Sequence, residues 1–213
     1  MIIESLNIGL PKIETFCGSK IATGICKRPI SGPLNLTTDG FEGDGVGDLK
    51  HHGGIDKAVC VYSLDHYPYW EDLLKIKLPE AAFGENLTVS GLREEDICIG
   101  DIFEAGSALL QVSQPRQPCR TLSARYKRDD MIKLVRDSGH TGFYFRVLRS
   151  GRVKQGDHLQ LKEKDRNVVT VAFANSIFHH QRTDCAGIER VLAVAALSAS
   201  WRKSFLELIQ ACT

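Results

Sequence analysis

Short apolar runs separated by turn residues fill the first 164 residues, a pattern typical of a mainly β structure. Runs rich in β-branched and aromatic residues predict strands at 2–8, 20–27, 86–89, 97–99, 102–105, 108–112, 143–148 and 158–161. So many short strands favour a β-barrel. The segments "CIGDIFEAG" and "KQGDHLQLK" resemble each other, each with a Gly-Asp turn before an extended run, and we expect them to be paired edges of one sheet system.

Two helices are expected to interrupt these strands. In "SLDHYPYWEDLLK" Ser63 can cap the first turn and Trp70 lies on the apolar face. In "DDMIKLVRDSG" Asp129 is the expected cap and Gly139 ends the helix. Both apolar stripes predict core packing.

The polar run "KEKDRN" at 162–167 precedes a change of period, which predicts a β-barrel domain at 1–164 and a small helical domain at 168–213. Three short helices are expected, at 171–178, 184–195 and 200–210. Three helices can also form a helix-turn-helix DNA reader, but this segment has four Lys and Arg against three acidic residues. That charge is too weak for binding a phosphate backbone, so we expect a packing or docking unit.

The net charge of the whole chain bears on possible partners but not on the predicted fold. Twenty-seven Lys and Arg against 26 Asp and Glu leave a formal net charge of +1, which disfavours nucleic-acid and membrane partners. The start "MIIESLNIGLPK" has neither the basic residues nor the apolar run of a secretory signal, so a cytoplasmic protein is expected. The seven cysteines include no CxxC pair, and we expect mostly reduced core thiols, without a disulfide framework or a zinc ribbon.

The sharpest candidate chemistry is Cys119 in "QVSQPRQPCR". Pro115 and Pro118 restrict the backbone around it, and Arg116 and Arg120 lie close in sequence. Nearby guanidinium groups lower the pKa of a thiol, and the thiolate is the form that attacks electrophiles or binds soft metals. From these ten residues alone, a surface loop with an incidental cysteine explains the pattern equally well.

A second candidate is the segment "HHGGIDK". Gly53 and Gly54 allow backbone amides to approach a ligand, and Lys57 and a charged His52 would attract phosphate. Asp56 could orient a histidine. The alternative is a tight polar turn whose glycines serve only a positive φ.

Three further polar residues lie at strand ends or on strands. Glu85 and Asn86 in "FGENL" could hydrogen-bond the amide edge of a heterocycle or could tie down a loop. Arg146 in "GFYFRVL" has apolar neighbours, and such an arginine usually has a carboxylate or phosphate partner. Structural pairing is the simpler reading of Arg146.

Taken in order, "GFEGD", "LKHHGGIDKAV", "FGENL", "IGDIFEAGSALLQVSQPRQPC" and "GFYFRVLRSGRVKQGD" resemble the MOSC family, the domain at the C-terminus of molybdenum cofactor sulfurases. More narrowly, the chain is similar to the YiiM-type subgroup from about residue 39 to 161, and its tail resembles the three-helix domain of that subgroup. One departure is Val46, where we expect a Gln two residues after Asp44.

The resemblance implies a MOSC-type β-barrel that binds the molybdenum cofactor in its molybdopterin form, with Cys119 as catalytic residue and metal ligand or as sulfur carrier. The residues implied in cofactor binding are His52, Gly53, Gly54, Asp56, Lys57, Glu85, Asn86, Arg116, Arg120 and Arg146. Members of the subgroup are associated with reduction of N-hydroxylated bases such as 6-hydroxylaminopurine, which makes an N-hydroxylated small molecule the expected substrate. No flavin or nicotinamide fingerprint is present, so a separate reductase is expected to supply electrons, and no role for pyridoxal phosphate is expected.

Two other functions stay open at this point. The chain could be a carrier that delivers the cofactor, or a persulfide on Cys119, without turnover. It could also be a thiol hydrolase in which His51 or His52 serves as the base for Cys119.

Overall fold

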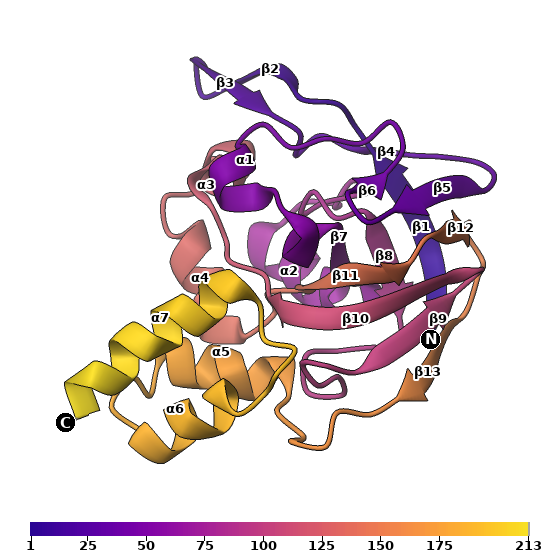
Figure 1. Cartoon of the computed structure of the whole chain (residues 1–213). Coiled ribbons are helices and arrows are strands. Elements are labelled where there is room, and N and C mark those ends of the chain that lie inside the picture. The colour runs from indigo at the N-terminus through magenta and orange to yellow at the C-terminus, as the bar shows by residue number, and fades with distance from the viewer. Residues whose placement is uncertain (213) are drawn as a thin grey trace.

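A curled sheet of eight strands forms the body of the chain (Figure 1). The computed structural model describes residues 1–212, apart from the side chains of Lys50 and Ala211. The strands are β1 (Ile2–Ile8), β4 (Arg28–Pro29), β7 (Val59–Ser63), β8 (Leu87–Ser90), β9 (Ile102–Ala105), β10 (Ala108–Pro115), β11 (Phe143–Arg149) and β13 (Leu159–Glu163). Their order is β13-β9-β10-β11-β7-β8-β1-β4, and only β7 and β8 pair in parallel among the named strands.

Backbone hydrogen bonds between β1 and the start of β13 draw the two sides of this sheet together. The Leu159 amide donates to the Met1 carbonyl at 3.1 Å, and the Ile3 amide donates to the Asp157 carbonyl at 2.9 Å. The sheet therefore curls into a barrel, which confirms the predicted mainly β fold. The predicted pairing of the two Gly-Asp segments is also confirmed, because β9 and β13 are antiparallel neighbours.

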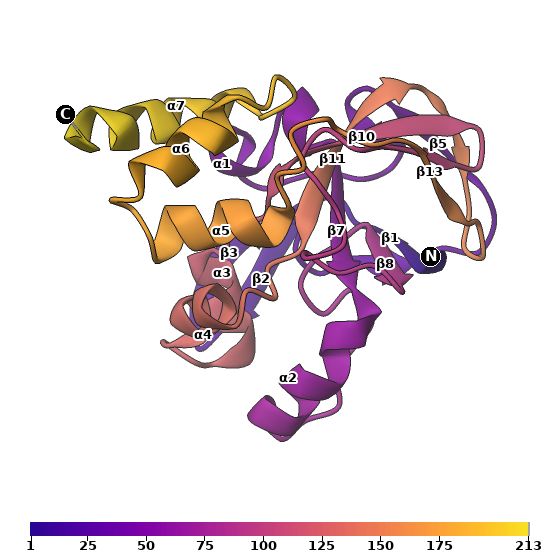
Figure 2. The ribbon, with the colours of Figure 1, turned by 90° about the horizontal axis from the view of Figure 1, so that it is seen from below.

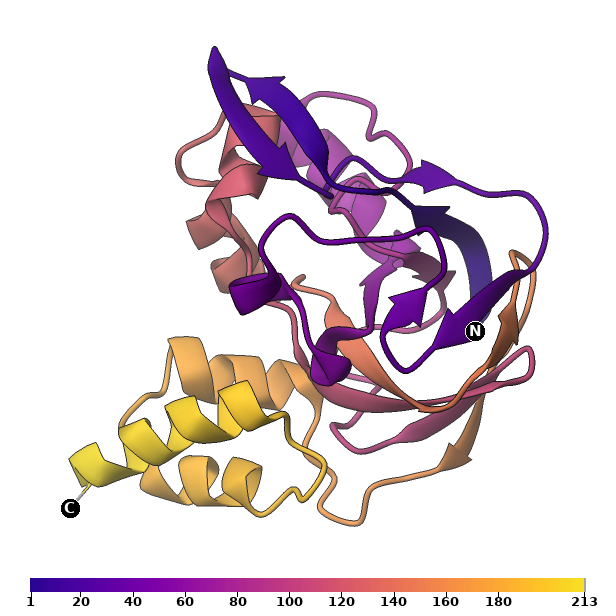
Figure 3. The same ribbon diagram turned by 45° about the horizontal axis from the view of Figure 1, so that its top comes forward.

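Two smaller sheets extend the barrel. One contains β5 (Leu34–Thr37), β6 (Gly40–Phe41) and β12 (Gly151–Val153), and the other is the hairpin of β2 (Lys12–Phe16) and β3 (Ser19–Thr23), which projects from the body in Figure 3. The predicted strand at 97–99 is wrong, since this buried segment makes only an isolated bridge between Cys98 and Thr170. Strand β7 was missed because all five of its residues are buried, which removes the alternation that marks a strand.

Short helices connect the strands: α1 (Leu49–His52), η1 (Ile55–Lys57), η2 (Leu64–His66), α2 (Tyr67–Leu74), α3 (Arg120–Tyr126) and α4 (Met131–Ser138). Ser63 caps the first turn as predicted, with its hydroxyl accepting from the Asp65 amide. The predicted cap at Asp129 is wrong, because α4 begins after Asp130; it ends at Gly139, as predicted. Figure 2 shows α2 projecting away from the barrel.

The C-terminal segment forms α5 (Val171–His179), α6 (Cys185–Leu192), α7 (Ala199–Ile209) and the short η3 (Gln210–Cys212). Thr170, Asp184 and Ser198 each cap one helix with a side-chain oxygen, which explains where the helices begin. Buried residues of these helices, including Phe205, belong to the same hydrophobic core as the barrel. The division into domains at 1–164 and 168–213 stays a prediction.

One disulfide joins Cys185 at the start of α6 to Cys212 at the end of η3. This pair was not predicted, and the sequence offered no local signal for it because the two cysteines are 27 residues apart, but it does not amount to a disulfide framework. The free cysteines are Cys17, Cys26, Cys60, Cys98 and Cys119. Within residues 1–212, no helix is long and apolar enough to cross a membrane.

Candidate functional site

A cavity of about 1280 Å³ lies where several distant segments of the chain meet. Its walls come from the loop after β3, the segment that contains α1, the start of β8, the end of β10 and helices α5 and α7. Figure 3 shows α1 between the β2–β3 hairpin and α7. The predicted site residues that line the cavity are His52, Gly53, Gly54, Lys57, Asn86, Arg116, Cys119 and Arg120.

The Cys119 thiol is half-buried at the point where β10 leads into α3. Burial by itself raises the pKa of a thiol, but here a hydrogen bond from His52 and the charge of Arg116 outweigh burial and lower the pKa of Cys119 to about 6. The thiolate is therefore the main form at neutral pH. The local prediction of an activated cysteine agrees with this environment, although its main partner is His52 rather than an adjacent arginine.

Two side-chain donors at this cavity are buried without a hydrogen-bond partner among the described residues. They are Nη1 of Arg116 and Nε2 of Gln117. Arg116 is only 6% exposed, and its Nη2 donates to the Phe83 carbonyl. Buried donors are normally paired, since each unpaired one costs about 1–3 kcal/mol. The two donors therefore suit a bound group that is rich in acceptor atoms.

The histidine-glycine turn forms a second wall of the cavity. Gly54 has a φ of 102° and open space around its Cα, so this turn exposes backbone in a conformation that favours glycine. Nζ of Lys57 donates to the His51 carbonyl at 2.7 Å, and burial lowers the pKa of Lys57. The His51 ring pairs instead with Asp48 at 2.7 Å, so His52 is the histidine that serves Cys119.

Buried polar residues at the cavity form a hydrogen-bonded network that the sequence did not reveal. Lys27 forms an ion pair with Asp44, and Nδ2 of Asn86 donates to Asp44 at 2.7 Å. Oδ1 of Asn86 accepts from the Cys60 amide at 3.0 Å, which places the Cys60 thiol at the cavity as well. Burial raises the pKa of Cys60 to about 11, so this thiol stays neutral.

Three predicted site residues do not line the cavity. The Glu85 carboxylate accepts from the Tyr67 hydroxyl at 2.6 Å and from the Phe83 amide at 2.9 Å, so it ties down a loop. Arg146 pairs with Asp56 at 2.7 Å and also donates to the Ala196 carbonyl at 2.8 Å. Arg146 and Asp56 thus join the barrel to the C-terminal helices, which corrects their assignment to the cofactor.

The family model described as MOSC domain matches residues 48–160, and the model described as YiiM-like, 3-alpha helix domain matches residues 169–211. The chain belongs to the MOSC domain family. The second match and the crystal structure of YiiM from Geobacillus stearothermophilus support its place in the YiiM-type subgroup.

Individual proteins that are similar to this chain support the family assignment. This MOSC chain is 51% identical over 205 residues to YflK of Bacillus subtilis, with 96% of this chain and 93% of YflK covered. The crystal structure of YiiM from Geobacillus stearothermophilus superposes with a TM-score of 0.85 at 38% identity, covering 98% of both chains. A protein of Gibberella moniliformis named "Reductase" is 36% identical over 155 residues, which cover 69% of this chain and 27% of that protein.

MOSC domains are associated with the molybdenum cofactor, and the cavity residues fit such a group. A thiolate suits a soft metal, and the unpartnered donors on Arg116 and Gln117 suit phosphate or pterin acceptors. Val46, which stands where we expected a Gln, lines the same cavity and offers only an apolar side chain. Fewer polar contacts are therefore available on that wall.

Proposed function

We propose that this MOSC protein is a molybdenum-dependent reductase that converts N-hydroxylated bases, such as 6-hydroxylaminopurine, to amines. The observation that carries the proposal is the Cys119 thiol, which ionises with a pKa of about 6 beside the unpartnered Arg116 donor. A thiolate close to a fixed cation, in a cavity of this size, suits a metal carried by a phosphorylated organic group.

The residues of the chain take distinct parts in this proposal. Cys119 is the metal ligand, and His52 keeps its sulfur ionised. Arg116 and Gln117 bind acceptor atoms of the cofactor, and Lys57 with the glycine turn binds its phosphate. When bound, the cofactor supplies a metal that exchanges two electrons. The overall reaction breaks the N–O bond of the substrate and consumes two electrons and two protons, with an amine and water as products.

We further propose that the electrons come from a separate reductase, as the sequence predicts. In the Gibberella relative named "Reductase", the region that matches this chain is 27% of a longer protein. Here a second polypeptide would supply the electrons.

The proposal is tested by purifying the full chain from a host that makes the molybdenum cofactor and from a host that cannot. Molybdenum content and reduction of 6-hydroxylaminopurine by a reduced viologen dye are measured for the native chain, for Cys119→Ala and for Cys17→Ala, a control at an exposed free thiol. We expect activity in the native chain and in Cys17→Ala, and at least about a 10³-fold loss in Cys119→Ala, a change of about 4 kcal/mol in barrier.

Other outcomes point to other functions. Bound molybdenum that transfers to an apo-enzyme without any turnover would favour a cofactor carrier. The hydrogen bond from His52 to Cys119 also suits a thiol nucleophile with its base, so hydrolysis of a test ester by protein from the cofactor-deficient host would favour a hydrolase. Either result would overturn the reductase.

A further inference from the structure

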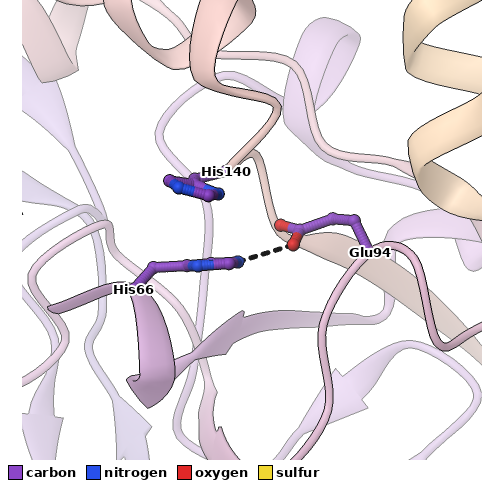
Figure 4. A group of neighbouring side chains, drawn as sticks. All are labelled: His66, Glu94 and His140. Atoms are coloured by element: carbon purple, nitrogen blue, oxygen red, sulfur yellow. Dashed lines mark hydrogen bonds and ion pairs between the residues drawn. The ribbon is translucent and has the colours of Figure 1, made fainter. Parts of the chain in front are cut away.

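Three side chains that can ligate a metal meet in the interior, outside the Cys119 cavity. His66, Glu94 and His140 place one nitrogen or oxygen atom each within 4.8 Å of one another (Figure 4). His66 and Glu94 are each 3% exposed at the side chain, and His140 is half-buried. None of the three lines the cavity.

The cluster joins three loops that lie far apart in the sequence. His66 ends η2, Glu94 lies in the loop after β8, and His140 lies in the loop that leads into β11. No sequence motif marks these residues, because each loop contributes a single side chain.

The cluster offers two imidazoles and one carboxylate, a ligand set that Zn²⁺ takes in proteins.

A zinc ion would fit among the three side chains after a local change in the positions of the two histidine rings. Nε2 of His66 lies 2.6 Å from Glu94 Oε2, closer than the roughly 3.3 Å that two ligands of one tetrahedral zinc ion keep at bonds of about 2.0–2.1 Å. Glu94 Oε1 accepts a hydrogen bond from the Gly142 amide at 2.6 Å, and this bond orients the carboxylate. The His140 ring stacks on His66 at 3.8 Å between ring centroids and packs edge-on against Tyr69 at 4.9 Å, so it must rotate before its nitrogen can face the same ion as His66.

We infer that His66, Glu94 and His140 form a divalent-metal site that binds Zn²⁺ through two imidazole nitrogens and one carboxylate oxygen. Nε2 of His66 would bind the ion as the unprotonated nitrogen of the ring, and water would take the fourth position. The ion would clamp the loop before β11, and the Gly142 carbonyl of that loop accepts from the Arg116 amide at 3.0 Å. An ion at this site would therefore support the segment that carries the cavity arginine.

The test uses the full chain in a Cys119→Ser background, so that the reactive thiol does not compete for metal. Zn²⁺ affinity is measured by competition with a chromophoric chelator, and Co²⁺ replaces Zn²⁺ for absorption spectra. His140→Ala removes the half-buried ligand and leaves the His66–Glu94 contact in place. His179→Ala is the matched control, because His179 is another half-buried histidine and lies outside the cluster.

We expect one Zn²⁺ per chain, bound about tenfold or more weakly in His140→Ala and equally well in His179→Ala. Glu94→Gln should also weaken binding, and where that variant fails to fold, His140→Ala decides. The Co²⁺ complex should lack a thiolate charge-transfer band. Equal affinity in His140→Ala and His179→Ala, or a thiolate band, would overturn the site, and neither result bears on the molybdenum chemistry at Cys119.

Discussion

The imidazole of His52, at the end of α1, hydrogen-bonds to the thiol of Cys119, at the N-terminus of α3. This contact and the charge of Arg116 together outweigh burial, which acts in the opposite direction and raises the pKa of the thiol. The pair makes an ionised sulfur available at the cavity before any cofactor binds.

The first prediction concerns the pH dependence of Cys119 reactivity in protein from a cofactor-deficient host. Because the thiolate is the nucleophile, the rate of alkylation by iodoacetamide should rise with pH and reach half its maximum near pH 6. His52→Ala should move this midpoint upward, toward the ordinary thiol value. His51→Ala is the control and should leave it unchanged, since that ring pairs with Asp48. A native midpoint at the ordinary thiol value would contradict the His52 contact.

The second prediction separates the two thiols at the cavity. Burial raises the pKa of Cys60 to about 11, so at pH 8 Cys60 should stay unmodified while Cys119 is fully alkylated. Mass spectrometry of peptides after a short pulse of iodoacetamide measures both. Equal labelling of the two residues in folded protein would show that the Cys60 thiol is accessible and that its assigned burial is wrong.

The third prediction uses the unpartnered amide of Gln117. Gln117→Met keeps the size of the side chain but removes the buried donor, so cofactor-free protein should become more stable by about 1–3 kcal/mol in urea unfolding. The same variant should retain less molybdenum through gel filtration, because the bound group loses a donor. Lower stability together with full molybdenum retention would indicate that the Gln117 amide stabilises the fold and does not bind the cofactor.

The fourth prediction concerns the junction between the barrel and the C-terminal helices. Arg146→Ala removes the ion-pair partner of Asp56, which keeps the hydrogen bond from the Ala199 amide, and should lower the free energy of unfolding by about 2 kcal/mol. Arg149→Ala, on the same strand, is the control: its contact with Glu104 is exposed and 3.6 Å long, so the loss should stay below about 1 kcal/mol. Molybdenum retention by folded Arg146→Ala should be unchanged, and a specific loss of molybdenum would return Arg146 to the cofactor site.

Candidate residues that look alike in the sequence can have different surroundings in the structure. Glu85 and Asn86 were indistinguishable as candidates, yet Asn86 lines the cavity while Glu85 binds the Tyr67 hydroxyl on another side of the loop. The resemblance assigned both Arg116 and Arg146 to the cofactor, but Arg116 has an unpartnered donor at the cavity and Arg146 is paired with Asp56. The direction of a side chain depends on the backbone around it, which composition does not reveal.

The sequence by itself determined the mainly β class and the start of each C-terminal helix to within a residue, and it singled out Cys119 as a candidate, because propensity, capping and proline constraints act over a few residues. Only the tertiary structure decided that His52 serves Cys119, that Arg146 does not line the cavity, and that His66, Glu94 and His140 meet. These contacts depend on how the sheet curls and which loops it brings together, and that requires the packing of the whole chain.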